Sequence, residues 1–303
     1  MEGRRRVRVI NTIAEMKAAR RGWQGTSQLV GVVPTMGYLH AGHLALVHRA
    51  RAETNLVAVS IFVNPTQFGP TEDLSRYPRD LPRDLALLEA AGTDVVFAPQ
   101  PADVYPPGFA TYVVPTGPLS ERLDGASRPT HFRGVATVVA KLFNIMLPHR
   151  AYFGQKDAQQ VAVLRRMVAD LHVPTDLVVV STVREADGLA MSSRNAYLGP
   201  EDRAAAVILR RALEAGRARF DDRRADDPAE VQAVVEAMRA VVQAEPRATL
   251  DYVDVCHPDT FEPLATLGAP ALLALAARVG PARLIDNYLL RRDATWDTGT
   301  TGA

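Results

Sequence analysis

The chain has 303 residues, of which 47% are hydrophobic and 23% charged, and 35 basic and 34 acidic residues give a formal net charge of +1. This composition is typical of a globular protein with one large or two modest domains. The balanced charge does not favour nucleic acid as a partner. Every apolar run is shorter than the ~18 residues of a membrane span, so a membrane is not favoured either. The single cysteine, Cys256, excludes an internal disulfide framework and a metal site of several cysteines, and it favours a cytoplasmic setting with Cys256 in the core.

The first half of the chain alternates apolar, β-rich runs with helical patterns. Strands are expected at 29–35, 55–65, 94–99, 150–154 and 175–184, and helices at 41–53, 80–92, 133–146 and 157–171. Continuous apolar strands separated by helices are typical of a parallel sheet covered on both faces. We therefore predict an α/β fold, with a Rossmann-like parallel sheet in an N-terminal domain over residues 1–184.

The pattern changes after about residue 185. Two long helical segments precede three strand-like runs in close succession, an order that favours antiparallel pairing. We predict a smaller α+β C-terminal domain over residues 185–290. The tail, residues 291–303, is poor in apolar residues and is predicted to be disordered.

The stretch "PTMGYLHAGHLALVHRA" (34–50) lies where a predicted strand meets a predicted helix. Gly37 and Gly42 let the main chain approach a ligand, and the unpaired N–H groups of a helix start favour an anion. His40 and His43, three residues apart, can both donate to phosphate oxygens. The alternative is that one histidine caps the turn and the other packs; His48, on another side of the helix, is interpreted as an ordinary helix residue.

Several common catalytic motifs are missing from the sequence. It contains no GxxxxGK[ST] phosphate loop, no strand-linked GxGxxG with an acidic partner and no GxSxG elbow. The sequence therefore supports neither a P-loop kinase, nor a dinucleotide dehydrogenase, nor a serine hydrolase of that type.

The 34–50 stretch resembles the HxGH signature of nucleotidylyltransferases and class I aminoacyl-tRNA synthetases. Five ordered stretches narrow the resemblance to the pantoate–β-alanine ligase family, over roughly residues 10 to 290. These stretches are "PTMGYLHAGHLALVHRAR", "SIFVNPTQFGPTEDLSRYPRD", "RPTHFRGVATVVAKLFNI", "YFGQKDAQQVAVLRRMVADL" and "DGLAMSSRNAYL".

The resemblance implies an ATP-dependent condensation of (R)-pantoate with β-alanine. Pantoate and ATP would give enzyme-bound pantoyl adenylate and pyrophosphate, and β-alanine would then give pantothenate and AMP. It also implies Mg²⁺ with the ATP, a homodimer, and small-molecule substrates rather than nucleic acid or a membrane.

The family's site residues match this sequence position by position. The implied catalytic residues are His43, His40 and Lys156. The implied ATP-binding residues are Met36, Gly37, Tyr38, Leu39, His40, Ala41, Gly42, His43, Gly154, Gln155, Lys156, Asp157, Val183, Met191, Ser192, Ser193 and Arg194. Met191 stands where the family commonly has Leu, a swap of similar volume from which we expect little effect.

Two glutamines and an asparagine are the expected contacts of the acid and amine substrates. The resemblance implies that Gln67 binds pantoate and β-alanine and that Gln160 binds pantoate. Asn64 lies beside Gln67 in the loop after the most apolar strand. Neutral amides suit a hydroxy acid because they donate and accept without adding charge.

Two sets of residues keep alternative interpretations. Arg128, His131 and Arg133 either line the entry for two carboxylate substrates or hold a loop as buried hydrogen-bonding groups. Asp73, Asp80 and Asp84 are candidates for Mg²⁺ or its waters, and the sequence does not choose among them.

Two other functions compete with this prediction. Another HxGH nucleotidylyltransferase would share the first stretch but lack the others. A regulatory module that has lost catalysis is disfavoured because every matched site residue is present. The C-terminal domain begins beside the Ser192–Arg194 loop, which predicts that it acts as a lid over the ATP site.

Overall fold

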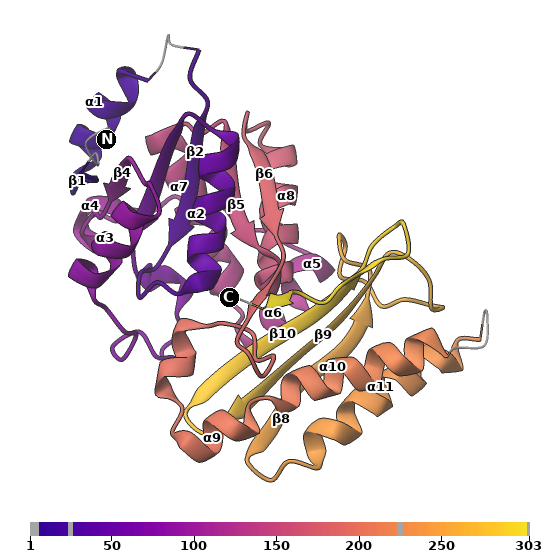
Figure 1. Ribbon diagram of the computed structural model, residues 1–303. Coiled ribbons are helices and arrows are strands. Elements are labelled where there is room, and N and C mark those ends of the chain that lie inside the picture. Colours follow the sequence, from indigo (N-terminus) through magenta and orange to yellow (C-terminus); the bar gives the residue numbers. More distant parts are fainter. Residues whose placement is uncertain (1–5, 24–26, 223–226, 302–303) are drawn as a thin grey trace. The chain divides into compact units, whose positions relative to one another are not determined.

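The computed structural model describes residues 6–23, 27–222 and 227–301. The chain forms two compact units, and Figure 1 traces it through both. Unit 1 comprises Met1–Thr116, Arg128–Gly154 and Val163–Val180; unit 2 comprises Gly117–Ser127, Gln155–Ala162 and Ser181–Ala303.

Unit 1 contains a six-stranded sheet in which every pair of neighbours is parallel. Its strands, in spatial order, are β1 (Arg8–Ile10), β4 (Val95–Phe97), β3 (Leu56–Ile61), β2 (Val30–Thr35), β5 (Arg150–Gly154) and β6 (Asp176–Val180). The chain passes from β2 to β3 and β4 on one side, and later returns to β5 on the other. The carboxyl ends of β2 and β5 are therefore a topological switch point, where parallel α/β sheets bind ligands. The predicted Rossmann-like sheet is confirmed.

Helices of unit 1 connect these strands. They are α1 (Ile13–Arg21), α2 (Ala41–Glu53), α3 (Leu81–Ala90), α4 (Pro101–Val104), α7 (His131–Met146) and the part of α8 (Ala158–Asp170) from Val163 onward, with the short 3₁₀ helix η1 (Pro65–Gln67) after β3. The core includes Val33, Val59 and Val96 of the sheet with Val47 of α2 and Leu88 of α3, all fully buried. Continuous apolar strands are what this two-sided burial requires.

Unit 2 contains a four-stranded antiparallel sheet, which confirms the predicted α+β architecture. Its strand order is β11 (Trp296–Asp297), β10 (Ala282–Leu290), β9 (Ala271–Val279) and β8 (Ala248–Cys256). Helices α10 (Ile208–Asp221) and α11 (Ala229–Gln243) pack on it through a core that includes Leu213, Met238 and Leu273. The remaining elements are α5 (Pro118–Glu121), α6 (Asp124–Ser127), η2 (Gln155–Asp157), β7 (Val183–Arg184), η3 (Ser193–Tyr197), α9 (Pro200–Ala205) and β12 (Thr300–Thr301).

Three segments that the sequence assigns to the first domain belong to unit 2: residues 117–127, 155–162 and 181–184. Residues 117–127 join it because Arg122 donates to Asp254 and to the Phe261 carbonyl oxygen. Residues 155–162 join it because Asn287 donates to the main chain there. The roles expected of the two domains, catalysis and closure, stay predictions.

The prediction of a disordered tail at 291–303 is wrong for residues 291–301. β11 pairs with β10, and β12 pairs in parallel with β7. Main-chain pairing orders this segment although it contains few apolar residues, and the Asp297 carboxylate adds a bond from the Ser181 hydroxyl at 2.8 Å. Residues 302–303 lie outside the described residues.

Cys256 is fully buried in β8, as predicted. Burial, with a smaller contribution from Asp254, raises the pKa of its thiol to about 12. Within the described part of the chain, no helix is both long and apolar enough to cross a membrane.

Candidate active site

The turn between β2 and α2 carries the first group of predicted site residues. Gly37 and Tyr38 both have positive φ, 82° and 51°, so the chain reverses sharply after Met36. A Cβ on Gly37 would lie 3.0 Å from a methyl group of Ile61 and 3.1 Å from an Asp84 carboxylate oxygen. Glycine therefore meets both the conformation and the space that this turn allows.

Two histidines bind main-chain N–H groups at the start of α2. His40 is the N-cap, and its Nδ1 accepts the Gly42 N–H at 3.1 Å. His43 Nδ1 accepts the His40 N–H at 3.3 Å, and the ring centroids are 4.0 Å apart. Because each Nδ1 is an acceptor, each neutral ring carries its proton on Nε2 as a hydrogen-bond donor. Both histidines therefore cap the helix start through Nδ1, as the alternative interpretation expected of one of them. This capping leaves Nε2 as the donor atom of each ring.

Asp84 of α3 holds the same turn. It is 1% exposed, and its carboxylate oxygens accept the Tyr38 N–H at 2.7 Å and the Leu39 N–H at 2.8 Å. Burial raises the pKa of Asp84 and outweighs the two N–H donors, which lower it. Sequence reasoning missed this role. The available signal was an acidic residue on the apolar face of α3, four positions before the fully buried Leu88.

Asn64 and Gln67 lie at η1, and they are 1% and 9% exposed. Asn64 Nδ2 donates to Gln67 Oε1 and to the Gly134 carbonyl oxygen, both at 3.1 Å, and its Oδ1 accepts the Tyr105 hydroxyl at 2.8 Å. Because the Gln67 oxygen is an acceptor here, its NH₂ end remains the donor, and it lies 3.0 Å from Met36 Sδ, a weak acceptor. The structure thus brings the predicted Gln67 and Met36 together within unit 1.

Arg128 and His131 hold the loop at Gln67. His131 Nδ1 donates to the Gln67 carbonyl oxygen at 3.0 Å, and Arg128 donates to the same oxygen at 3.2 Å. Arg128 also makes a bidentate pair with Glu72 at 2.8 and 2.7 Å. Of the two interpretations of these residues, the geometry favours loop-holding groups. Arg133 is exposed and lies over the Tyr112 ring, 4.8 Å from its centroid.

The second group of predicted residues lies in unit 2, directly after β5 ends at Gly154. Gln155, Lys156 and Asp157 form η2, with Gln155 buried and the side chains of Lys156 and Asp157 18% and 48% exposed. Lys156 Nζ lies 3.9 Å from the Asp157 carboxylate. Gln160 is partly exposed one turn further on. Its neighbour Gln159 is a buried structural residue that bonds to the main chain of Leu119, Arg122 and Asp124.

The remaining predicted residues surround β7 and η3 in unit 2. The Val183 carbonyl oxygen accepts the Met191 N–H at 2.9 Å. Ser192 is the N-cap of η3 and accepts the Arg194 N–H at 3.2 Å, while Ser193 is 7% exposed. This cap fixes the direction of the Ser192–Arg194 loop, whose hydroxyls and guanidinium are of the kind that bind phosphate.

Mg²⁺ was expected to accompany ATP, with Asp73, Asp80 and Asp84 as candidate ligands for the ion or its waters. Over the part of the chain that the structure describes, no group of three or more His, Cys, Asp or Glu side chains could hold a metal ion. Asp80 caps α3 by accepting the Arg83 N–H, and Asp84 accepts the two N–H groups of the turn. Both carboxylates therefore accept main-chain N–H groups, and Mg²⁺ binding stays a prediction.

The chain is similar to a well-defined set of known proteins. A family model described as pantoate-beta-alanine ligase matches residues 8–289. The pantothenate synthetase of Roseiflexus castenholzii is 60% identical over 286 residues, which cover 94% of this chain and 99% of that protein. The pantothenate synthetase of Geobacter sulfurreducens is 50% identical over 284 residues, with 94% and 99% covered.

Solved structures agree with these similarities. Pantothenate synthetase from Thermus thermophilus aligns with a TM-score of 0.87 at 52% identity, covering 93% of this chain and 98% of that one. Pantoate-beta-alanine ligase from Francisella tularensis, complexed with beta-gamma ATP and beta-alanine, aligns with a TM-score of 0.76 at 34% identity, covering 93% and 97%.

Proposed function

The chain belongs to the pantoate–β-alanine ligase family, and from this membership we infer which of its residues carry the family's reaction. The protein uses ATP to join pantoate to β-alanine and so forms pantothenate. We propose that the pantoate carboxylate attacks the α-phosphorus of ATP and that pyrophosphate leaves. The β-alanine amine then attacks the carbonyl carbon of pantoyl adenylate, and AMP leaves.

The hydrogen bonds of His40 and His43 are the observation that carries this proposal. Both Nδ1 atoms accept main-chain N–H groups, so both rings present a proton on Nε2. Two fixed donors beside a helix N-terminus stabilise negative charge that develops on a transferring phosphate. We assign His43 as the main donor to the α-phosphate region, with His40 assisting.

No strong base is required of the protein. The pantoate carboxylate is ionised at neutral pH and is already a nucleophile. The residues therefore act by alignment and by charge stabilisation. Lys156 supplies a positive charge for the departing pyrophosphate, and Ser192, Ser193 and Arg194 bind the β- and γ-phosphates.

The other matched positions complete the ATP assignment. Asp157 is assigned to the ribose, and the main chain near Val183 and Met191 to the base. The remaining nucleotide contacts are Met36, Gly37, Tyr38, Leu39, Ala41, Gly42, Gly154 and Gln155. Mg²⁺ enters with ATP and neutralises phosphate charge, with few ligands from the chain.

Gln67 and Gln160 are assigned to the pantoate and β-alanine substrates. Asn64 engages the Gln67 oxygen, which leaves the Gln67 NH₂ group as a donor for a carboxylate or hydroxyl oxygen. Asn64 is buried and makes bonds at both ends of its amide, which supports a role in orienting Gln67.

We further propose a cytoplasmic homodimer. Tyr112 and Val114 of unit 1 are 40% and 58% exposed, and we take this apolar segment as the candidate subunit contact. A single buried cysteine is compatible with a reducing compartment. Sedimentation of the protein and of Val114→Asp tests the dimer; a protein that sediments as a monomer at micromolar concentration would contradict it.

Pantoate-dependent ATP–pyrophosphate exchange tests the proposed chemistry. We expect exchange with pantoate alone and AMP release when β-alanine is added. His43→Ala and Lys156→Ala should each slow exchange by about 10²-fold, the scale of losing a preorganised charge-stabilising donor. Exchange driven instead by a nucleotide monophosphate or phosphoalcohol, or a His43→Ala variant within a few-fold of the parent, would refute these assignments.

A further inference from the structure

Asn287 connects the sheet of unit 2 to the Lys156 loop. It lies on β10 and is 4% exposed. Its Nδ2 donates to the Gln155 carbonyl oxygen at 3.0 Å and to the Lys156 carbonyl oxygen at 2.9 Å. Its Oδ1 accepts the Gln155 Nε2 at 3.2 Å. One side-chain amide thus holds two consecutive residues of η2 by three hydrogen bonds.

These bonds define the orientation of the Asn287 amide. Two carbonyl oxygens require the NH₂ end, and the Gln155 donor requires the oxygen end. Neither aspartate nor leucine, although similar in size to asparagine, could form these three hydrogen bonds. Aspartate would face two carbonyl oxygens with a carboxylate, and leucine would leave buried polar groups without partners.

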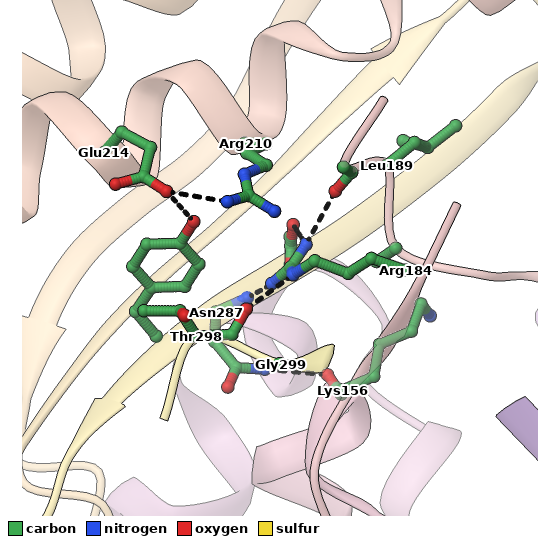
Figure 2. A network of polar contacts seen from close by, with 12 residues as sticks. Lys156, Arg184, Leu189, Arg210, Glu214, Asn287, Thr298 and Gly299 are labelled. Atoms are coloured by element: carbon green, nitrogen blue, oxygen red, sulfur yellow. Dashed lines mark hydrogen bonds and ion pairs between the residues drawn. The ribbon is translucent and has the colours of Figure 1, made fainter. Parts of the chain in front are cut away.

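The main chain of Asn287 is itself held by a hydrogen bond to Asp286. The Asp286 carboxylate accepts the Asn287 N–H at 2.8 Å and pairs with Arg184 at 2.7 Å. Figure 2 shows Asn287 facing the main chain at Lys156, while the Lys156 side chain extends away from this network. The network therefore fixes the main chain of Lys156, while the Lys156 ammonium group lies outside the network.

We propose that Asn287 is a positioning residue for the adenylation step: it fixes the main chain of Gln155 and Lys156 and thereby the direction in which the Lys156 ammonium reaches phosphate. This inference rests on the proposed role of Lys156. A flexible lysine acts as a point charge, so its contribution depends on where its main chain is held. A displacement of about 1 Å can cost on the order of 10²-fold in rate.

A double-mutant cycle in pantoate-dependent exchange tests the proposal. We expect Asn287→Ala to lower kcat by about 10- to 100-fold with a smaller change in the KM for ATP. In a Lys156→Ala background, Asn287→Ala should have little further effect, because its action passes through that lysine. If the rate losses of the two single variants multiplied in the double variant, Asn287 would have a general structural role and the proposal would be overturned.

Tyr288→Phe is the matched control. It removes one partly buried hydrogen bond from the next residue of β10, the 2.6 Å bond to Glu214, without touching η2, and should leave exchange unchanged. Should Asn287→Ala not fold, Asn287→Ser keeps one donor in a smaller side chain and carries the same expectation. An Asn287 variant as active as the parent overturns the inference. If Lys156→Ala itself were fully active, the proposed role of Lys156 would fail first, and the two failures are thereby distinguished.

Discussion

Arg184 and Asp286 form a bidentate ion pair in the interior of unit 2. The guanidinium donates to the two carboxylate oxygens at 2.7 and 2.9 Å, and each side chain is 1% exposed. Two of its other three N–H groups donate to the carbonyl oxygens of Gly188 and Thr298. Burial lowers the pKa of Arg184, but the charge and hydrogen bonds of Asp286 outweigh it and hold that pKa above its ordinary value. The pair therefore joins β7, β10 and the tail through one buried ion pair.

Removing either partner should destabilise unit 2 strongly. Arg184→Met leaves a buried carboxylate without its counter-charge, and we expect the free energy of unfolding to fall by about 3–5 kcal/mol. Urea unfolding followed by circular dichroism measures the change. Adding Asp286→Leu to Arg184→Met should recover part of the loss, because the second substitution removes the unpaired charge. A double variant less stable than Arg184→Met alone would contradict this account.

Replacing Asp84 should lower the rate of ATP–pyrophosphate exchange by more than a general loss of stability would. Asp84→Asn keeps one acceptor oxygen but places an NH₂ group against one of the two N–H donors of the turn. We expect ATP–pyrophosphate exchange to fall by about 10- to 100-fold, since the His40–His43 turn loses its fixed position. Thr12→Ala is the control for stability alone: it removes the N-cap of α1, a loss of about 1 kcal/mol, without touching this turn. Equal exchange rates in the two variants would rule out the positioning role of Asp84.

Local pattern predicted the parallel sheet and the place of the histidine turn. A run such as 55–65, rich in β-branched residues, is typical of a strand buried on both sides, and β3 (Leu56–Ile61) lies within it. The glycines beside His40 and His43 indicated a helix start, and α2 begins at Ala41 as expected. These features depend on residues within one strand–turn–helix unit, so the sequence displays them directly.

The contacts that hold the predicted loops were not visible in the same way. Asp84 bonds to residues 45 and 46 positions away, and Asn287 bonds to residues 131 and 132 positions away. A single polar residue on an apolar face or strand carries no information about its partner. The tail shows the same limit, because main-chain pairing with β7 and β10 orders it without an apolar pattern of its own.

The Glu72–Arg128 pair should make stability depend on pH in the acid range. Burial raises the pKa of Glu72, but the hydrogen bonds and charge of Arg128 outweigh it, so that pKa lies below its ordinary value of 4.5. A lowered folded-state pKa contributes stability above the unfolded value, and this contribution is lost as pH falls through the folded value. The stability difference between the parent and Glu72→Gln should therefore shrink as pH falls from 7 to below 4.5.

An Arg128→Met background isolates the contribution of the Glu72–Arg128 pair to this pH dependence. In Arg128→Met, the guanidinium that lowers the pKa of Glu72 is gone while the burial that raises it remains, so the stability difference between Glu72 and Gln at this position should no longer shrink as pH falls. Urea midpoints at several pH values measure both comparisons. The same pH dependence in the presence and absence of Arg128 would show that Arg128 is not the cause.

The tail should contribute stability although it lies beyond residue 289, where the family match ends. Trp296 packs edge-on against Phe220, with ring centroids 5.3 Å apart, and donates to Asp221 at 3.1 Å. The Thr300 N–H donates to the Thr182 carbonyl oxygen at 2.8 Å. These contacts brace the segment that leads through β7 to the Ser192–Arg194 loop.

Truncation after Arg292 should therefore lower the Tm by several degrees. It leaves the Arg184 Nε–H without the Thr298 carbonyl oxygen that accepts it, and it removes two strand pairings. An unmet charged donor alone costs about 1–3 kcal/mol, and about 1 kcal/mol shifts the Tm of a large domain by ~2–4 °C. Trp296→Ala separates the ring contacts from the main-chain pairing and should reproduce only part of the shift. Thermal unfolding by differential scanning calorimetry measures both variants. A truncated chain that melts at the temperature of the full chain would mean that the tail rests on unit 2 without stabilising it.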